Sequence, residues 1–523
     1  MTERPATIAV LLDRAAEQFG RLEAMVDGDV RWNFVELREH AHRAGRALMA
    51  SGLGPGDRIA IWAPNIREWA VVALGAFSVG AVVVPINTRF KGAEAGYVLD
   101  KANVDLLFTV SDFLDTDYVG LLAAADVHVG EIVVLRGSVP PGTTSFGDFM
   151  VRADTITDGA RAERGVAVDG DDLCLILFTS GTTGAPKGAM LRNSAICRAY
   201  DSWATVVGLR AGDRYLVVNP FFHSFGLNAG ILACLLKGAT IVPHAVFDVP
   251  SVMARIPEEQ ISMLPGPPAI YQTILNHTDL DDFDLTSLRL AVTGAAAIPV
   301  QLIHDMRSTL GFETVVTGYG LTESSGVATM CRHDDDAETI ATTSGRAIPD
   351  VEVRIVDDDG REVPRGEPGE IVVRGYNVMA GYLDDPEQTA EAIDADGWLH
   401  TGDIGVMDDR GYIDITDRKK DMYIVGGFNA YPAEIENVLL AHDDIGQVAV
   451  VGIADDRLGE VGAAFVVAAP GAEPDPEQII AWARERMANY KVPRQVAVID
   501  ALPLNASGKV LKYELRERAA TED

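Results

Sequence analysis

An apolar run that opens into a glycine- and hydroxyl-rich loop constrains this chain more than any other feature. Residues Leu173–Leu177 are predicted to form a buried strand, and a helical pattern begins near Asn193. The loop Phe178–Gly188 carries three glycines, four hydroxyl side chains and one lysine. Glycines let backbone N–H groups approach a ligand, hydroxyls donate hydrogen bonds, and lysine adds positive charge. The sequence therefore predicts a phosphate-binding loop with these contacts: Thr179, Ser180, Gly181, Thr182, Thr183, Gly184 and Lys187.

Two familiar loop types do not fit this segment. The phosphate loop of nucleotide hydrolases needs Gly-Lys-Ser/Thr, and Pro186 stands at the glycine position. A nucleophile elbow of the G-x-S-x-G type needs a glycine where Phe178 stands. A flexible linker would not follow a buried strand so abruptly. The loop is therefore expected to hold phosphate by another arrangement.

Helical and strand patterns alternate along the first 90 residues. Helical spacing covers Ile8–Phe19 and Asn33–Ser51, and short strands cover Arg58–Ala63 and Ala81–Ile86. The same pattern continues to about residue 340. It predicts an α/β fold, with a large N-terminal domain of parallel or mixed sheets flanked by helices.

One uncharged stretch, Trp69–Ile86, has 18 residues, the borderline length for a membrane span. Gly75 and Gly80 interrupt it, so a helix followed by a buried strand is the better interpretation, with no transmembrane segment. The first residues carry no long apolar segment typical of a secretory signal. The four cysteines match no metal, redox or disulfide spacing, and a reducing cytoplasm fits them best.

The pattern changes near residue 345. Short strands at Val353–Asp357, Gly369–Arg374 and Gly411–Thr416 predict a small β-rich subdomain over about 345–416. A charged run, Asp417–Asp421, follows it. Helical and strand patterns mix again after the run. We expect an N-terminal domain over 1–416, a junction at 417–421 and a small α+β domain over 422–523.

The charge balance narrows the classes of partner. Lys plus Arg total 44 and Asp plus Glu total 77, a net charge of −33. Binding along a nucleic-acid backbone requires a basic face, so this excess argues against nucleic acid and against docking on an anionic membrane. It does not exclude a small anionic ligand, because a few local donors suffice to hold one phosphate.

Seven further segments accompany the loop, in this order: Pro220–Gly226, Val292–Pro299, Tyr319–Glu323, Gly381–Leu383 with Trp398–Asp403, Asp417–Asp421, Gly426–Glu434 and Pro503–Lys509. Together they resemble the acyl-adenylate-forming superfamily of acyl-CoA ligases, peptide-synthetase adenylation domains and beetle luciferases. The resemblance covers nearly the whole chain. It implies that a carboxylic acid and ATP form an acyl-adenylate, and that the thiol of coenzyme A then displaces AMP.

The resemblance also implies roles for residues that contact ATP. Glu323 is the expected Mg²⁺ ligand, since a hard cation prefers carboxylate oxygen. Thr322 beside it is expected to donate to the α-phosphate. The adenine is expected between Tyr319 and the small residues Gly294, Ala295 and Ala296. The ribose is expected to contact Asp403 and Arg418.

Further roles concern the acyl group, the thiol and the movement of the small domain between the two half-reactions. The resemblance implies that Lys509 bridges the carboxylate and the α-phosphate during adenylation. Lys420 is the expected hinge residue, about which the small domain turns. Gly426 and Gly427 are then expected beside the channel of the pantetheine arm, where backbone must come close to a thin chain. His223 is expected to line the acyl pocket near the carboxylate.

Small residues in the candidate acyl pocket predict the size of the acyl group. A fused-ring or other alicyclic propionate is expected, because the candidate pocket wall is rich in small residues flanked by aromatic rings: Gly226, Gly230, Gly294, Ala295 and Ala296, with Phe221, Phe222 and Phe225. Several segments, including Leu264–Tyr271 and Met422–Gly427, resemble an actinobacterial branch that activates the propionate left on steroid C and D rings. A medium- or long-chain fatty acid is the alternative.

Other interpretations stay open from sequence. A carrier protein could accept the acyl group in place of coenzyme A. A non-catalytic AMP sensor should have lost Lys509 or Glu323, and both are present. The oligomeric state is open, with a homodimer among the options.

Overall fold

The computed structural model describes residues 6–179, 186–294, 298–418, 421–425, 428–430, 432–455, 458–484, 486–487, 489–504 and 510–521, without the side chains of 416–418, 424, 428, 429, 434, 520 and 521. Its α-helices are α1 (Ile8–Phe19), α2 (Phe34–Ala50), α3 (Arg67–Phe77), α4 (Gly92–Lys101), α5 (Tyr118–Ala124), α6 (Phe146–Val151), α7 (Asp158–Val166), α8 (Asn193–Val207), α9 (Ala233–Lys237), α10 (Val249–Glu259), α11 (Pro268–Leu275), α12 (Val300–Ser308), α13 (Ala337–Thr342), α14 (Pro386–Ala392), α15 (Pro432–Leu439), α16 (Pro476–Arg484) and α17 (Lys512–Thr521).

Helix α1 illustrates how local sequence sets an element. The Thr7 side chain accepts a hydrogen bond from the Val10 N–H at 3.2 Å and caps the helix start. Apolar residues then recur three and four positions apart, and this face is buried: Ile8, Leu11, Leu12 and Ala15. The helix covers Ile8–Phe19, as its periodicity predicts.

The central sheet has eight strands. Their order is β18 (Gly381–Tyr382), β9 (Lys187–Arg192), β8 (Leu173–Thr179), β4 (Val82–Pro85), β3 (Arg58–Trp62), β5 (Leu106–Thr109), β6 (Glu131–Val134) and β7 (Thr144–Ser145). The strands from β8 to β7 run parallel, whereas β9 and β18 are antiparallel to their neighbours. The predicted α/β class is therefore confirmed, with mixed strand directions.

The uncharged stretch Trp69–Ile86 supplies a helix and a strand of this layer. Most of it falls in α3 and in β4, whose four residues are all buried. Gly80 makes the turn between them at a φ of 76°. Among the described residues, no helix is both long and apolar enough to cross a membrane.

Two smaller sheets adjoin one another. One has the order β10 (Arg214–Val217), β11 (Thr240–Pro243), β1 (Glu23–Asp27) and β2 (Val30–Asn33). The other has the order β12 (Leu290–Thr293), β13 (Thr314–Tyr319), β14 (Thr329–Met330) and β15 (Arg346–Ala347). Met263 bridges Tyr215 of β10 and Leu290 of β12, so the two sheets are continuous through one residue.

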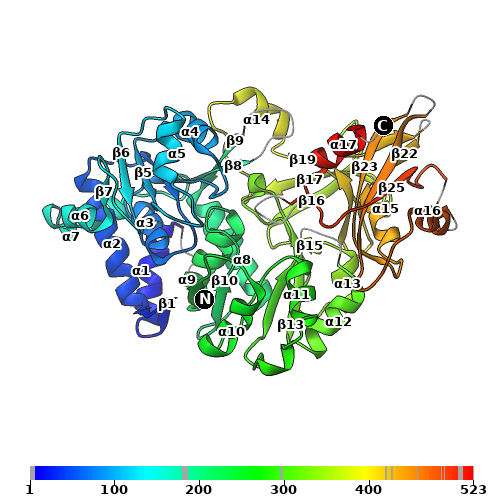
Figure 1. Ribbon diagram of the computed structural model, residues 1–523. Helices are drawn as coiled ribbons and strands as arrows, with labels where there is room; N and C mark the ends of the chain where they lie inside the picture. Colours follow the sequence, from blue (N-terminus) through cyan, green and yellow to red (C-terminus); the bar gives the residue numbers. More distant parts are fainter. Residues whose placement is uncertain are drawn as a thin grey trace.

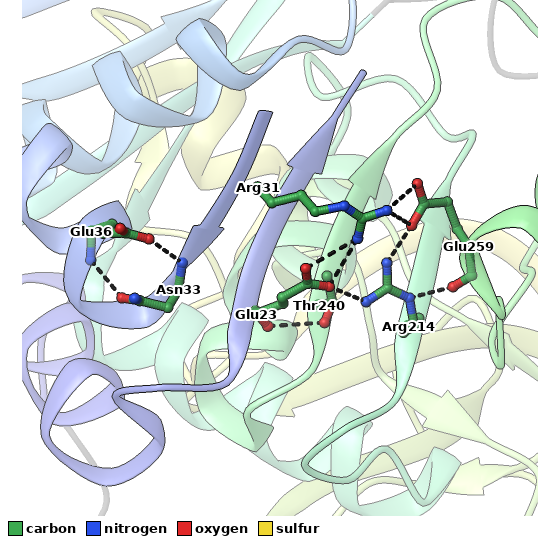
Figure 2. A network of polar contacts seen from close by, with 7 residues as sticks. All are labelled: Glu23, Arg31, Asn33, Glu36, Arg214, Thr240 and Glu259. Atoms are coloured by element: carbon green, nitrogen blue, oxygen red, sulfur yellow. Dashed lines mark hydrogen bonds and ion pairs between the residues drawn. The ribbon is translucent and has the colours of Figure 1, made fainter. Parts of the chain in front are cut away.

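Alternating arginine and glutamate side chains tie the first of these sheets together (Figure 2). Arg31 donates to Glu23 at 3.0 Å and to Glu259 at 2.9 Å, and Arg214 donates to the same two carboxylates at 2.5 Å. We call these four residues the Arg–Glu network. Burial alone would raise the pKa of Glu23, but hydrogen bonds from Arg214 and Arg31 outweigh it and lower that pKa.

The β-rich subdomain is an antiparallel sheet of β16 (Val351–Val356), β17 (Gly369–Gly375), β19 (Leu399–Met407) and β20 (Ile413–Arg418). The last sheet has the order β22 (Phe428–Ala430), β21 (Tyr423–Val425), β24 (Gly459–Ala468) and β23 (Ile445–Asp455), and β25 (Gln495–Val498) pairs with β24. Its elements gather at one end of the molecule, and α1, α2, α6 and α7 lie at the other (Figure 1).

The hydrophobic cores follow this division. One large core extends from Ile8 to Ile413. Two others lie on the β23–β24 sheet, where neighbouring residues alternate between them: Val448 and Val450 belong to one, Ala449 and Val451 to the other. The structure thus has a large N-terminal domain and a smaller C-terminal domain.

Two local elements were not predicted. One is β9, which pairs with β8 as an antiparallel hairpin and stands between the phosphate loop and α8. The helix α8 then begins at Asn193, where the helical pattern begins. The other is the π-helix Phe225–Leu232. π-Helical turns are rare and are frequent at functional sites.

Candidate functional site

The phosphate loop lies between the described ends of β8 and β9. Thr179 is the last residue of β8 and stands opposite Lys187 in the hairpin register. Ser180, Gly181, Thr182, Thr183 and Gly184 lie outside the described residues. The Lys187 ammonium donates to the side-chain oxygen of Gln388 and lies 5.2 Å from the centre of the Tyr382 ring. These two contacts hold the Lys187 ammonium against β18 and α14.

Tyr382, which lies beside Lys187, also positions Glu323. The Tyr382 hydroxyl donates to Glu323 Oε1 at 2.8 Å. Burial and the neighbouring carboxylate raise the pKa of Tyr382, so the hydroxyl keeps its proton and remains a donor. Tyr382 therefore connects two predicted site residues, Lys187 and Glu323, that lie far apart in the sequence. Because β18 pairs with β9, this strand contact brings the tyrosine to both.

A tight turn presents Thr322 and Glu323. They open a 3₁₀ turn, Thr322–Ser324, which the Gly326 N–H closes by donating to the Leu321 carbonyl at 2.8 Å. A Cβ on Gly320 would lie 2.4 Å from Val327 Cα, so glycine is required there. The buried Asn377 donates to the Val327 carbonyl at 2.8 Å and fixes the far side of the turn.

The two residues predicted for adenosine meet directly. The Tyr319 hydroxyl donates to Asp403 Oδ2 at 2.6 Å, and Asp403 is 4% exposed. Arg418 lies opposite Asp403 in the β19–β20 register, although its side chain is outside the description. Gly294 follows β12 with a φ of 152°, and a Cβ there would lie 3.3 Å from Thr317 Oγ1 on β13. The structure thus brings Gly294 and Tyr319 to the ends of the neighbouring strands β12 and β13, and Asp403 from the middle of β19 against Tyr319.

His223 sits just before the π-helix and is partly exposed. Its Nδ1 accepts a hydrogen bond from the Phe225 N–H at 3.2 Å, which leaves the proton of the neutral ring on Nε2. Desolvation lowers the pKa of His223, so the imidazole is neutral at pH 7. A neutral ring with an Nε2–H donor can orient a carboxylate but adds no positive charge to it.

Only some of the small residues predicted to line the acyl pocket can leave open volume in it. A Cβ on Gly226 would lie 2.0 Å from the Pro220 carbonyl, and a Cβ on Gly230 would lie 2.6 Å from the Val217 side chain. These glycines permit close packing and leave no volume where a side chain would stand. Phe221 is fully buried against Trp69 and belongs to the core. Phe222 and Phe225 are partly exposed, so they alone of the three rings can border the site.

The remaining predicted residues lie outside the described residues: Ala295, Ala296, Lys420, Gly426, Gly427 and Lys509. Two contacts were missed from sequence. Tyr382 was expected only as part of the segment Gly381–Leu383, and no role was expected for Gln388. Local sequence signals neither contact, because both depend on the pairing of β18 with β9.

Known proteins share this organisation along the whole chain. The AMP-binding enzyme family matches residues 12–383, and its C-terminal domain matches residues 434–509. A Rhodococcus jostii protein named 3-[(3aS,4S,7aS)-7a-methyl-1,5-dioxo-octahydro-1H-inden-4-yl]propanoyl:CoA ligase is 50% identical over 99% of both chains. A Mycobacterium tuberculosis protein of the same name is 49% identical over 98% of both chains.

The fold is also similar to that of a solved ligase structure. The anthranilate CoA ligase AuaEII in complex with anthranoyl-AMP superposes with a TM-score of 0.89 at 27% identity, over 99% of this chain and 98% of that one. The agreement includes both the large and the small domain. The chain belongs to the AMP-binding enzyme family and is an AMP-forming acid–CoA ligase.

Proposed function

We propose that this ligase activates a bulky alicyclic propionate of the kind left from steroid C and D rings. The proposal rests on the sequence identity of 50% and 49%, over nearly the full length, to two ligases that are named for such an acid. A medium- or long-chain fatty acid is the alternative substrate, and a carrier protein is the alternative acceptor. The four cysteines are free and buried, which supports a reducing cytoplasm as the compartment.

In the proposed first step, a carboxylate oxygen of the acid attacks the α-phosphorus of ATP. The bond to the bridging oxygen breaks, and pyrophosphate leaves with the electron pair. Lys187, Thr179 and the rest of the loop would hold the phosphates, and Thr322 would donate to the α-phosphate. These donors offset the repulsion between two anions. In the second step, the thiol of coenzyme A loses its proton and its sulfur bonds to the acyl carbon. The bond from that carbon to the phosphate oxygen breaks, and AMP leaves with the electron pair.

The adenosine would lie where Tyr319, at the end of β13, meets Asp403 of β19. The ring of Tyr319 would lie against the adenine, opposite Gly294, Ala295 and Ala296. Asp403 would accept from both ribose hydroxyls, and Arg418 would add a second contact. The bond between Tyr319 and Asp403 supports this assignment, because it holds both side chains in place before the nucleotide binds.

Magnesium fits the site as part of the nucleotide complex. Among the described residues, no group of three or more His, Cys, Asp or Glu side chains could hold a metal ion. Mg²⁺ is commonly held by one or two carboxylates together with substrate phosphates, and Glu323 supplies one carboxylate. Its hydrogen bond from Tyr382 is typical of a ligating carboxylate. Bound there, Mg²⁺ would neutralise phosphate charge.

The two steps would use two placements of the C-terminal domain. We place the domain limits at 1–416 and 422–523, with Lys420 as the hinge within 417–421. Lys509 would reach the carboxylate and the α-phosphate in the first placement. Gly426 and Gly427 would border the pantetheine channel in the second. The separate hydrophobic cores before and after this junction support a rigid-body turn.

Competition between acids tests the substrate. Equal amounts of the bicyclic dioxo propionate and octanoate would be incubated with limiting ATP, with and without coenzyme A, and the acyl products quantified. We expect the bicyclic acyl-CoA to dominate. Dominant octanoyl-CoA would contradict the steroid-type substrate, whereas pyrophosphate release without any CoA thioester would contradict the acceptor.

Separated half-reactions test Lys509. We expect Lys509→Ala to slow adenylate formation by ~10²–10³ or more, because it removes a charge needed in that transition state. Thioester formation from a supplied acyl-adenylate should be nearly unchanged. Equal loss in both half-reactions would contradict the assigned role.

A further inference from the structure

Three unpaired polar atoms gather behind the turn that carries Glu323. They are the hydroxyl of Tyr200 on α8 and both amide atoms of Asn228 in the π-helix. Tyr200 is 1% exposed and Asn228 is fully buried. The Tyr200 hydroxyl lies near Asn228 and Ser224, yet none of the three atoms forms a hydrogen bond of acceptable geometry with any described residue. We call Tyr200, Ser224, Asn228 and Gly326 the Tyr200 cluster.

Such a cluster is unusual in a folded interior. Buried polar groups are nearly always hydrogen-bonded, and leaving one unmade is unfavourable because the group has also lost its water. Burial raises the pKa of Tyr200, so the hydroxyl keeps its proton and is available as a donor. The Asn228 amide nitrogen is a second unpaired donor, and the amide oxygen is an unpaired acceptor. Unpaired donors outnumber the unpaired acceptor, which indicates an acceptor supplied by a ligand.

The cluster lies against the reaction site. Gly326 is partly exposed and follows Glu323 by three residues. A Cβ on Gly326 would lie 2.5 Å from the Tyr200 hydroxyl and 2.9 Å from Ser224 Oγ. Ser224 follows His223 directly. The cluster is thus directly beneath accessible surface, between the segment of His223 and the turn of Glu323.

We propose that Tyr200 and Asn228 form a subsite that donates hydrogen bonds to a ring carbonyl of the acyl substrate. This inference rests on the proposed function, in which the acid is a bicyclic propionate. The acid named for the two relatives carries two ring carbonyls, and a carbonyl oxygen can only accept hydrogen bonds. A fatty acyl tail has no such acceptor and would leave the buried donors unpaired. The subsite therefore selects an oxidised ring over a hydrocarbon of similar size.

The test compares two acids that differ only in the ring carbonyls. One is the bicyclic dioxo propionate, and the other is its analogue with both carbonyls replaced by methylene groups. For the dioxo acid, Tyr200→Phe and Asn228→Leu should each raise KM about 10–100-fold, the size expected for a lost hydrogen bond in a buried site. For the deoxygenated acid, KM should stay within about twofold, which also shows that each variant is folded.

Tyr215→Phe is the matched control, because the Tyr215 hydroxyl is also buried without a partner among the described residues but lies on β10. It should leave the preference between the two acids unchanged. Equal effects on both acids, or a wild-type enzyme that does not distinguish them, would overturn the subsite and leave the proposed function intact. A wild-type enzyme that activates octanoate and neither propionate would overturn the proposed function itself.

Discussion

The Arg–Glu network and the Tyr200 cluster are two buried or half-buried polar groups of opposite character. In the network, each carboxylate receives hydrogen bonds from both guanidinium groups (Figure 2). In the cluster, the side chains are neutral and three of their atoms have no partner among the described residues. The network lies across β1, β2 and β10 at the end of α10, whereas the cluster lies behind the turn Thr322–Ser324.

The contrast distinguishes a polar group that holds the fold from one that awaits a ligand. Complete pairing of the charges offsets their desolvation. When one charged side chain is removed, its partners stay desolvated without a compensating charge, and the fold is destabilised. Incomplete pairing leaves the folded protein with an unmet hydrogen-bonding capacity that a substrate can satisfy. Substitutions should therefore affect stability in the first region and specificity in the second.

The largest stability effect is expected for Glu259→Gln. The Glu259 side chain is 6% exposed and faces both arginines, so neutralising it should destabilise the fold by about 3 kcal/mol. Urea denaturation followed by circular dichroism would measure the loss. Adenylation per folded molecule should be unchanged at low temperature. An unaltered denaturation midpoint would mean that the network does not hold this sheet.

A smaller effect should separate two buried tyrosines. The Tyr271 hydroxyl donates to the Leu264 carbonyl at 2.9 Å, so Tyr271→Phe should cost about 1–2 kcal/mol. Tyr200→Phe removes a hydroxyl that has no partner among the described residues and should change stability by less than about 0.5 kcal/mol. Parallel unfolding curves of the two variants compare them directly. A comparable loss for Tyr200→Phe would show that its hydroxyl is already satisfied without substrate.

The smallest effect concerns pH. The pKa of Glu23 is lowered in the folded state from an ordinary value of 4.5, so its contribution to stability is present above about pH 4.5 and is lost as the pH falls through the folded-state value. Because the side chain is 36% exposed, Glu23→Gln should cost only a few tenths of a kcal/mol to ~1 kcal/mol at pH 7. The difference from wild type should be constant from pH 5 to 7 and shrink below pH 4. Persistence of the full difference at pH 3.5 would contradict the shifted carboxyl.

Local sequence was informative where neighbouring residues determine the structure. The apolar spacing of α1 predicted both of its ends. The strand β9 was missed because its pairing with β8 depends on the hairpin partner and not on its own pattern. The π-helix was missed because its aromatic and glycine residues fit no regular period.

The candidate site shows the same limit. Glu323 and Asp403 were singled out by short motifs, and each receives a hydrogen bond from a tyrosine hydroxyl. Their roles toward magnesium and ribose stay predictions. The contacts of Tyr382 were not predictable, since they depend on β18 reaching β9 across about 190 residues of chain. The glycines Gly226 and Gly230 were read as open space because sequence does not reveal what faces a missing side chain.

The parallel pairing of β1 with β11 has a consequence for synthesis on the ribosome. Met25 pairs with Ile241, and the Glu23 carboxylate waits for Arg214. At about 5–20 residues per second, roughly 10–40 s separate the emergence of the two strands. During that interval β1 has β2 as its strand partner, and the edge that later pairs with β11 is unpaired. An unpaired strand edge can pair with another chain, so the nascent protein is open to aggregation at this edge until residue 240 has emerged.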